Sequence, residues 1–439
     1  MKRVLVLGAG LVAKPLVRYL LDKGYQVNMA SRTVSKAEKM IDGHPNGKAH
    51  ALDVEDASKL PPFIRECDLA VSLLPPPFHP VVAKLCIEQK KQMVTTSYVS
   101  AAMQELDGAA KAAGVTILNE IGVDPGIDHM SAMRIIDAVR QKGGKITSFK
   151  SYCGGLPAPE ANDNPFGYKF SWAPRGVLLA GRNSALFLQD GRTVEIPSHR
   201  LFREMHVLPV EGCGDFEAYP NRDSISYIDV YGLQGIQTMF RGTLRNMGWC
   251  DCLYNYGKLG LLSLDEVDAK GKTYAQFMRE IAGAAAGEDL RVAVGRKLQI
   301  PTDALPVWNL HWLGMFSDRK FEVDRISPLD AMGNLMFEKL AFRPGERDMI
   351  VMFHQFRALY PNGKQEHITS SLIDYGIPQG DSSMSRTVSL PAAIGVHMIL
   401  SGKIKQPGVL RPVAPEIYNP VMDELAALKI VFSEKTQAI

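Results

Sequence analysis

The sequence predicts an α/β protein in which a parallel sheet carries helices on both faces and further domains follow. Between residues 1 and 120, short apolar runs alternate with stretches whose apolar residues recur at helical spacing. Such alternation is typical of parallel strands joined by helices. A glycine-rich turn, "GAGLVA" at residues 8–13, directly follows the first apolar run. Beyond residue 120, turn-rich stretches and further helical patterns indicate more than one domain in the 439 residues.

The individual elements follow from these periodicities. Strands are expected within residues 3–10, 26–31, 49–54, 68–74, 93–97 and 116–120, and helices within residues 11–24, 35–43, 79–90 and 102–114. In the first helix, Leu16, Tyr19 and Leu20 share one apolar stripe, and Lys23 followed by Gly24 is a typical helix end.

The turn at residues 8–13 has the pattern G-x-G-x-x-A, which is found in dinucleotide-binding (Rossmann) domains. Gly8 permits the tight turn, Gly10 lets the backbone approach a pyrophosphate, and Ala13 packs the helix against the strand. The helix N-terminus adds N–H groups and a partial positive charge that favour phosphate. The pattern also fits a plain strand–helix turn. Its position after an apolar strand and before a helix favours dinucleotide binding.

The end of the second strand, "NMASRT" at residues 28–33, indicates which dinucleotide is bound. NAD-binding domains usually place an acid here, about 20 residues past the glycine loop, on the ribose 2′-hydroxyl. This chain has Ser31, Arg32 and Thr33 instead. An arginine fork and two hydroxyls can bind a 2′-phosphate, which an acid would repel. A surface arginine is the alternative, but the missing acid favours NADP(H) as the cofactor.

Composition and charge exclude several classes of function. The net charge is only +3 and no block of like charge occurs, so a nucleic-acid partner is not expected. No apolar stretch reaches the roughly 18 residues of a membrane span. No leader pattern precedes the first strand, which predicts a cytoplasmic protein. The six cysteines suggest neither a disulfide framework nor a metal site, because Cys250 and Cys252 have no second Cys/His pair nearby.

Ionisable residues follow the sixth strand, in "NEIGVDPGIDHM" at residues 119–130. Ligands of open α/β sheets bind at the carboxyl ends of the strands, where Asp124, Asp128 and His129 are expected to lie. Helix capping by Asp124 or Asp128 is the competing interpretation, because Asp is a favoured N-cap residue. Pro125 and Gly126 indicate a turn whose backbone comes close to another group, which favours a functional role.

Two arginines stand in turn-like stretches further along the chain. Arg222 lies in "YPNRDS" and Arg245 in "RGTLRNMGW", downstream of a long Gly/Pro-rich loop that ends near Trp172. Long irregular loops in compact domains are often functional. Either arginine is a solvated surface residue unless the two converge on an anionic substrate.

Long segments match, in order, the motifs of one enzyme family. They are "LGAGLVAKP", "SRT", "SLLPPPFHP", "MVTTSYVS", "NEIGVDPGIDH", "SYCGGLPAPEANDNPFGYKFSW", "YPNRDS", "RGTLR", "ERDMIVMFHQF", "SSLIDYG" and "GVLRPVAPEIYNPVMDEL". On these segments the chain resembles the NADP-dependent, L-glutamate-forming saccharopine dehydrogenases, also called saccharopine reductases. The resemblance runs over almost the whole chain.

The resemblance implies three domains and a homodimer. An NADP-binding Rossmann domain is expected at residues 1–125 and about 391–439. A second α/β domain, which binds substrate and forms the dimer contact, is expected at residues 126–230 and about 336–390. A mostly helical insertion should occupy residues 231–335.

The family's binding residues fall on positions of this chain that match its motifs. Cofactor contacts are implied for Gly8, Ala9, Gly10, Leu11, Val12, Ser31, Arg32, Thr33, Asp53, Val54, Ser72 and Leu73. Substrate contacts are implied for Ser97, Tyr98, Asp124, Trp172, Arg222, Thr243, Leu244 and Arg245. Asp124, Tyr98 and His129 are the candidates for the catalytic acid or base. A water that relays protons through Asp124 is an equal alternative.

The implied reaction oxidises the secondary amine of saccharopine and yields L-glutamate and 2-aminoadipate 6-semialdehyde, or runs in reverse. Arginines suit the three carboxylates of saccharopine, and Asp124 suits an ammonium. Two alternatives stay open: a related C–N dehydrogenase of the carboxynorspermidine or opine type, and a non-catalytic NADP-sensing protein. A triamine-derived substrate has fewer carboxylates, so it depends less on Arg222 and Arg245.

The assignment of Arg32 to the 2′-phosphate is testable. We expect Arg32→Ala to weaken NADP(H) binding roughly 10- to 150-fold, through loss of about 1.5–3 kcal/mol of charge-assisted hydrogen bonding. NAD(H) binding should change little, because NAD(H) has no 2′-phosphate. Calorimetric titration with both cofactors measures this, and an equal loss for the two would mean that Arg32 supports the fold instead.

Overall fold

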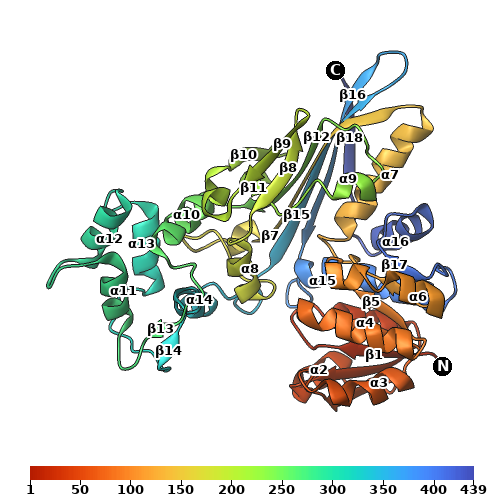
Figure 1. Ribbon diagram of the computed structural model, residues 1–439, viewed down its shortest axis with the longest axis horizontal. Coiled ribbons are helices and arrows are strands. Elements are labelled where there is room, and N and C mark those ends of the chain that lie inside the picture. The colour runs from red at the N-terminus through yellow and green to blue at the C-terminus, as the bar shows by residue number, and fades with distance from the viewer. The chain divides into compact units, whose positions relative to one another are not determined.

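The protein, described by a computed structural model, divides into two compact units (Figure 1). The structure describes residues 1–439, apart from the side chain of Ala57. The first unit comprises residues 1–146, 358–366 and 370–439, and the second comprises residues 147–357 and 367–369. Each is described by itself below.

The first unit is built on a seven-stranded sheet in the order β17-β6-β5-β4-β1-β2-β3. All six neighbouring pairs are parallel. The strands are β1 (Arg3–Leu7), β2 (Gln26–Ser31), β3 (Gly47–Ala51), β4 (Leu69–Ser72), β5 (Gln92–Thr95), β6 (Thr116–Leu118) and β17 (Gly408–Leu410). The doubly wound α/β class predicted from the sequence is confirmed.

Helices cover both faces of this sheet because its strands are apolar on both sides. On one face, Leu5, Leu7 and Met93 pack with α3 (Leu60–Glu66), α4 (His79–Glu88) and α6 (Asp107–Ala113) in one buried cluster. The opposite face is covered by α1 (Lys14–Asp22) and α15 (Ser383–Leu400), which contact each other. There Leu118 faces Gly395 of α15, where an added Cβ would lie 3.1 Å from a Leu118 methyl carbon.

Two details of the first unit differ from the sequence-based expectation. The helix predicted at residues 102–114 is two helices, α5 (Ala101–Gln104) and α6, because a fresh helix begins at Asp107. In addition, α7 (Ile127–Gln141) and residues 370–390 belong to the first unit, whereas the sequence placed them in the substrate domain. α16 (Pro415–Ala427) packs on both α7 and α15, which explains their grouping.

A buried ionic network joins four segments of the first unit around Glu120. Its Oε1 accepts hydrogen bonds from the Val99 amide and from Nε of Arg411, both at 2.9 Å, and its Oε2 accepts one from Nε2 of His129 at 2.9 Å. Glu120 is 1% exposed and has φ of 54°. Burial raises its pKa, but the bonds to His129, Arg411 and Val99 outweigh burial and lower the pKa to about 2. The carboxylate therefore stays ionised.

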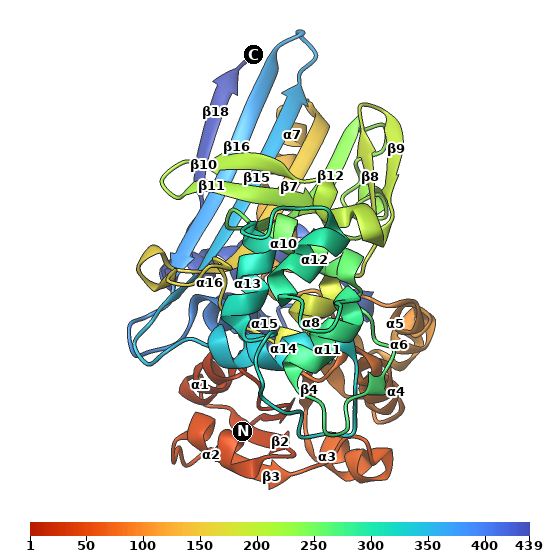
Figure 2. The same ribbon diagram turned by 90° about the vertical axis from the view of Figure 1, so that its left-hand side faces the viewer.

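The second unit contains a mixed sheet in the order β10-β11-β12-β7-β15, with β8 beside β12 and β9 beside β8. The strands are β7 (Lys145–Pro157), β8 (Ala185–Gln189), β9 (Arg192–Ile196), β10 (His206–Val210), β11 (Gly214–Pro220), β12 (Thr238–Arg245) and β15 (Asp348–Leu359). β12 is parallel to β7 and antiparallel to β8 and β11. The hairpins β8–β9 and β10–β11 are visible in Figure 2.

Residues 249–339 of the second unit are mostly helical, as the sequence predicts. They form α10 (Trp249–Leu259), α11 (Tyr274–Ala282), α12 (Leu290–Leu298), α13 (Leu305–Leu313) and α14 (Pro328–Lys339), with a short pair of strands, β13 (Val267–Asp268) and β14 (Arg325–Ile326). Figure 2 shows α10 to α13 gathered together, and neighbouring helices contact one another. These helices lie within the second compact unit.

The Glu120 network predicts a specific loss of stability. Glu120→Gln removes the charge that pairs with Arg411 and His129, and we expect the free energy of unfolding at neutral pH to fall by about 2–4 kcal/mol. The pKa of Glu120 is lower in the folded protein than in the unfolded chain, where it is about 4.3. The carboxylate therefore stabilises the folded protein at pH values above about 4.3, and this stabilisation is lost as the pH falls toward about 2. The difference in the free energy of unfolding between the wild type and the variant should therefore become smaller as the pH is lowered.

Urea unfolding at several pH values measures this effect. Glu66→Gln is the control, because Glu66 is exposed in the same unit and should change stability by less than about 0.5 kcal/mol. A Glu120→Gln variant as stable as this control would contradict the role given to the network.

Candidate functional site

The glycine turn lies where β1 and β4 meet, at the point where the strand order of the sheet reverses. Gly8 has φ of 106°, and a Cβ added to it would lie 2.8 Å from the Leu73 carbonyl oxygen. A Cβ added to Gly10 would have no heavy atom within 4 Å. The turn is therefore tight at Gly8 and open at Gly10, which fits the space that a pyrophosphate needs.

The residues expected to contact the cofactor around Gly10 differ in how far they are exposed to solvent. Leu11, directly after Gly10, is 65% exposed, whereas Ala9 is buried and 8% exposed. The Val12 carbonyl accepts a hydrogen bond from the Ser389 hydroxyl of α15. Ser72 at the end of β4 is fully buried, whereas Leu73 is half-buried. A direct cofactor contact by Ser72 therefore requires local movement.

The Arg32 side chain is exposed to solvent, directly after the last residue of β2. It forms an ion pair of 3.7 Å with Glu55, and both side chains are about 70% exposed (72% and 69%). Such an exposed pair contributes at most about 1 kcal/mol, so a phosphate can replace Glu55 at little cost. Ser31 and Thr33 flank Arg32, and Asp53 and Val54 follow β3 at the same edge of the sheet. Of these residues, Arg32 and the hydroxyls of Ser31 and Thr33 have the donors that a 2′-phosphate needs.

Tyr98 and Asp124 meet at the same carboxyl edge. The Tyr98 hydroxyl donates to Oδ1 of Asp124 at 2.9 Å, and both residues are half-buried. Asp124 does not cap α7, because the N-cap position is Gly126. Asp128 instead accepts a hydrogen bond from the Gly126 amide. Asp128 thus binds the amide of the N-cap residue from within the first turn, whereas Asp124 lies outside the helix and is hydrogen-bonded to Tyr98.

The turn at Pro125 and Gly126 is tight for a reason internal to the loop. A Cβ on Gly126 would lie 2.1 Å from the Gly122 carbonyl oxygen, and the Gly122 amide donates to the Pro125 carbonyl at 2.8 Å. The close backbone approach expected here is therefore between two parts of one loop. The loop fixes the place of Asp124.

His129, the third catalytic candidate, is enclosed. Its ring is 0% exposed, with Nε2 on Glu120 and Nδ1 at 3.5 Å from Oδ2 of Asp128. A carboxylate on either side orients the ring and leaves it no open surface. Of the three candidates, Tyr98 and Asp124 have the accessible geometry.

In the second unit, Arg245 is a buried cation without a carboxylate partner among the described residues. It is 6% exposed, its Nη1 donates to the Leu244 carbonyl, and its Nε has no hydrogen-bond partner. The guanidinium carbon lies 4.9 Å from the Tyr168 ring centroid and 5.6 Å from the Trp249 ring centroid. Trp249 Nε1 is also buried and unpartnered. Because buried charges are normally paired, this site is suited to an anion.

The other expected substrate residues of the second unit lie at different depths. Leu244 is fully buried. Thr243 is half-buried and lies opposite Cys153 in the register of β12 and β7. Arg222 is exposed, with φ of 53°. Trp172 is half-buried and packs against Gly176, where a Cβ would lie 2.9 Å from the indole ring. Of these expected residues, Arg245 alone combines charge with deep burial.

Residues that shape the Arg245 site were not predicted from the sequence. Glu217 pairs with Arg245 in the register of β11 and β12, but its carboxylate accepts from the Gly248 and Cys250 amides at 2.8 and 2.7 Å. It thereby caps α10 and positions Trp249. An acid and an arginine on adjacent strands would suggest an ion pair, and only the structure shows that the acid is engaged elsewhere.

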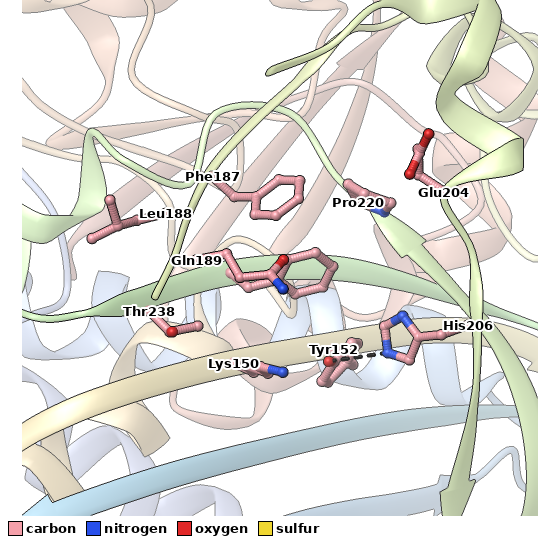
Figure 3. Close-up of a pocket in the computed structure, with 10 residues that line it drawn as sticks. Lys150, Tyr152, Phe187, Leu188, Gln189, Glu204, His206, Pro220 and Thr238 are labelled. Carbon is pink, nitrogen blue, oxygen red and sulfur yellow. Dashed lines mark hydrogen bonds between the residues drawn. The ribbon is translucent and has the colours of Figure 1, made fainter. Parts of the chain in front are cut away.

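A separate hollow of about 220 Å³ lies on the other face of this sheet (Figure 3). Phe240 and Tyr152 are among the residues that line it, and His206 hydrogen-bonds the Tyr152 hydroxyl at 3.3 Å. Burial, and then the charge of Lys150, lowers the pKa of His206. Residues alternate between faces along a strand, so this hollow and the Arg245 site are on opposite sides of β12.

The remaining expectations concern metals, membranes and cysteines. Among the described residues, no group of His, Cys, Asp and Glu could hold a metal ion. Within the same residues, no helix has the length and apolarity to cross a bilayer. All six cysteines are free thiols, and Cys250 and Cys252 are buried, where burial raises both pKa values.

These features define a class of protein: a dinucleotide-binding protein of the Rossmann type with a second compact unit. Residues 4–118 match the family model described as the saccharopine dehydrogenase NADP binding domain, and residues 122–430 match the saccharopine dehydrogenase C-terminal domain. The chain therefore belongs to the saccharopine dehydrogenase family. The Rossmann fold and the resemblance inferred from the sequence are both confirmed.

Individual relatives agree with this assignment. Saccharopine dehydrogenase [NADP(+), L-glutamate-forming] of Saccharomyces cerevisiae is 41% identical over the full length of both chains. The enzyme of the same name from Pyricularia oryzae is 41% identical over 97% of this chain and 96% of its own. The mitochondrial alpha-aminoadipic semialdehyde synthase of Bos taurus is 37% identical over 99% of this chain and 48% of its own.

A solved structure matches over the whole chain as well. The apo histidine-tagged saccharopine dehydrogenase (L-Glu forming) from Saccharomyces cerevisiae superposes with a TM-score of 0.91 at 39% identity, covering 100% of both chains.

The two glycines of the turn form a matched pair for a test. Gly10→Val should fold normally, because its side chain enters open space, yet should abolish NADPH binding by occupying the pyrophosphate position. Gly8→Ala should instead lower stability by about 1–3 kcal/mol, through strain at positive φ and contact with Leu73. Urea unfolding and calorimetric titration separate the effects, and normal NADPH affinity in folded Gly10→Val would refute the loop assignment.

Proposed function

We propose that this protein is an NADP-dependent saccharopine dehydrogenase that interconverts saccharopine, NADP⁺ and water with L-glutamate, 2-aminoadipate 6-semialdehyde and NADPH. Its family membership and the names of its full-length relatives support this reaction. The open turn at Gly10 and the exposed Arg32 support NADP(H) as the cofactor, which supplies hydride transfer when bound.

The observation that carries the substrate assignment is the unpaired, buried guanidinium of Arg245. A buried cation costs free energy unless a partner of opposite charge completes it. Nε of Arg245 and Nε1 of Trp249 are both donors without acceptors in the described chain. We assign to them one carboxylate of saccharopine, and we assign a further carboxylate to the exposed Arg222.

The Tyr98–Asp124 pair is assigned to the substrate nitrogen. A carboxylate can accept hydrogen bonds from an ammonium, and the Tyr98 hydroxyl orients the Asp124 carboxylate through Oδ1. Asp124 can hold or pass a proton at the secondary amine, either directly or through a water molecule. Ser97 in the first unit, and Trp172, Thr243 and Leu244 in the second unit, are assigned to substrate binding.

A cytoplasmic location and a homodimer are part of the same proposal. The resemblance to the family supports the homodimer, and the cytoplasmic location is the expectation drawn from the sequence. Sedimentation equilibrium of the purified protein tests the dimer, and fractionation of the source cells tests the location.

The assay that tests the function is saccharopine-dependent reduction of NADP compared with NAD. Steady NADPH consumption with glutamate and the semialdehyde would exclude a non-catalytic sensor. Turnover of a triamine-derived substrate in place of saccharopine would move the assignment to a related C–N dehydrogenase.

Arg245→Met tests the carboxylate contact. We expect kcat/KM for saccharopine to fall at least tenfold, about 1.4 kcal/mol of transition-state stabilisation, with NADP(H) affinity unchanged. Because Arg245 has no carboxylate partner to orphan, the variant should be as stable as wild type or more so. Arg245→Lys should rescue only in part, since its point charge lacks the two-pronged contact.

Arg192→Ala serves as the matched control, because Arg192 is an exposed arginine of the same unit. Unchanged saccharopine kinetics in Arg245→Met would overturn the contact. A large loss of stability would show that Arg245 has a structural role.

A further inference from the structure

His79 connects two serines at the carboxyl edge of the first unit's sheet. Its Nδ1 lies 2.8 Å from Oγ of Ser72, at the end of β4, and its Nε2 lies 2.8 Å from Oγ of Ser97, just beyond β5. The histidine is the first residue of α4 and is 4% exposed. Both ring nitrogens are engaged, so three polar side chains form one continuous chain between neighbouring strand ends.

The protonation state of the His79 ring determines the directions of the hydrogen bonds between Ser72, His79 and Ser97. Burial lowers the pKa of His79 to about 4, so the imidazole is neutral at physiological pH. A neutral imidazole has one N–H donor and one acceptor nitrogen. One serine must therefore accept from the ring while the other donates to it. At any moment, only one of the two serine hydroxyl hydrogens is available to a further partner.

The burial of Ser72 decides the direction. Ser72 is 0% exposed, and in the described chain His79 is the partner of its hydroxyl. If Ser72 accepted from Nδ1–H, its own hydrogen would be buried without an acceptor, which is costly. Ser72 therefore donates to Nδ1, and Nε2–H donates to Ser97. The hydroxyl hydrogen of the half-buried Ser97 then points away from His79.

We propose that His79 is a positioning residue that presents the Ser97 hydroxyl as a hydrogen-bond donor to a carboxylate of the substrate. The proposal rests on the function proposed above and deepens it. Ser97, held as a donor, suits an oxygen acceptor, whereas the Asp124 carboxylate in the same unit suits a nitrogen donor. The two side chains thus favour opposite ends of an amino-acid group, and His79 sets the polarity of one of them.

Two amide variants of His79 separate positioning from packing. Glutamine places its amide nitrogen near the position of Nε2 and can still donate to Ser97, whereas asparagine reaches only the position of Nδ1. We expect His79→Gln to keep kcat/KM for saccharopine within about threefold of wild type, and His79→Asn to lower it at least about tenfold, chiefly through KM. NADPH affinity and the urea midpoint should be alike in the two variants.

A double-mutant cycle connects the effect to Ser97. Ser97→Ala should lower kcat/KM at least about tenfold, and adding His79→Asn should cause no further loss, because both changes remove the same hydrogen bond. Fully additive losses would overturn the coupling. Equal activities of His79→Gln and His79→Asn would overturn the positioning role.

A measurement on the ligand-free protein tests the directions of the two hydrogen bonds of His79 and does not require turnover. Nitrogen-15 NMR of histidine-labelled wild-type protein distinguishes a protonated ring nitrogen from an unprotonated one. We expect Nε2 of His79 to be protonated and Nδ1 unprotonated at neutral pH, and a protonated Nδ1 would overturn the proposal. If the wild-type protein does not turn over saccharopine, the proposed function fails, while this spectrum still decides the state of His79.

Discussion

The ion-paired carboxylate of Glu120 is the constraint on which the first unit's carboxyl edge depends. One buried side chain holds the segment after β5 through Val99, the segment after β17 through Arg411 and the start of α7 through His129. The Glu120 amide also donates to the Ser97 carbonyl at 3.1 Å. Because Ser97, Tyr98 and Asp124 all lie on segments tied to Glu120, a single charge sets their relative places. The buried charge is tolerated because Arg411, His129 and the Val99 amide donate hydrogen bonds to it.

The second unit uses the opposite arrangement. Its central charge, Arg245, is buried against two aromatic rings and has no carboxylate among the described side chains. The nearby acid that could neutralise it, Glu217, is committed to the N-terminus of α10. Cation–π contacts compensate only part of the desolvation, since each contributes about 0.5–2 kcal/mol. An unpaired buried charge of this kind weakens the free protein and strengthens its affinity for an anion, which is the balance expected of a binding site.

The sequence predicted the first unit well because its elements are local. Strand and helix periodicities and the pattern of Gly8 and Gly10 depend on residues close together in the chain, and the order of the parallel strands follows from the fold class. The division into units was harder, because α7 and α15 join the first unit through contacts between residues far apart in sequence. The candidate site shows the same limit. Arg245 could be named from its motif, but its lack of a carboxylate partner could not be predicted. It depends on Glu217, which lies opposite Arg245 in the β11–β12 register and is bound to the Gly248 and Cys250 amides.

Two buried histidines show why a residue type near a predicted site does not reveal its role. His129 stands five residues after Asp124 in a motif rich in acids, and the structure places it between the carboxylates of Glu120 and Asp128. His79 stands in an apolar stretch without acidic neighbours, and the structure places it between two hydroxyls. The Glu120 carboxylate is ionised and can only accept from Nε2, so the His129 ring is fixed by its surroundings. Hydroxyls can donate or accept, so the neutral ring of His79 and the burial of Ser72 together decide which hydrogen reaches the open edge. The partners of each ring, which are distant in sequence, determine what it contributes.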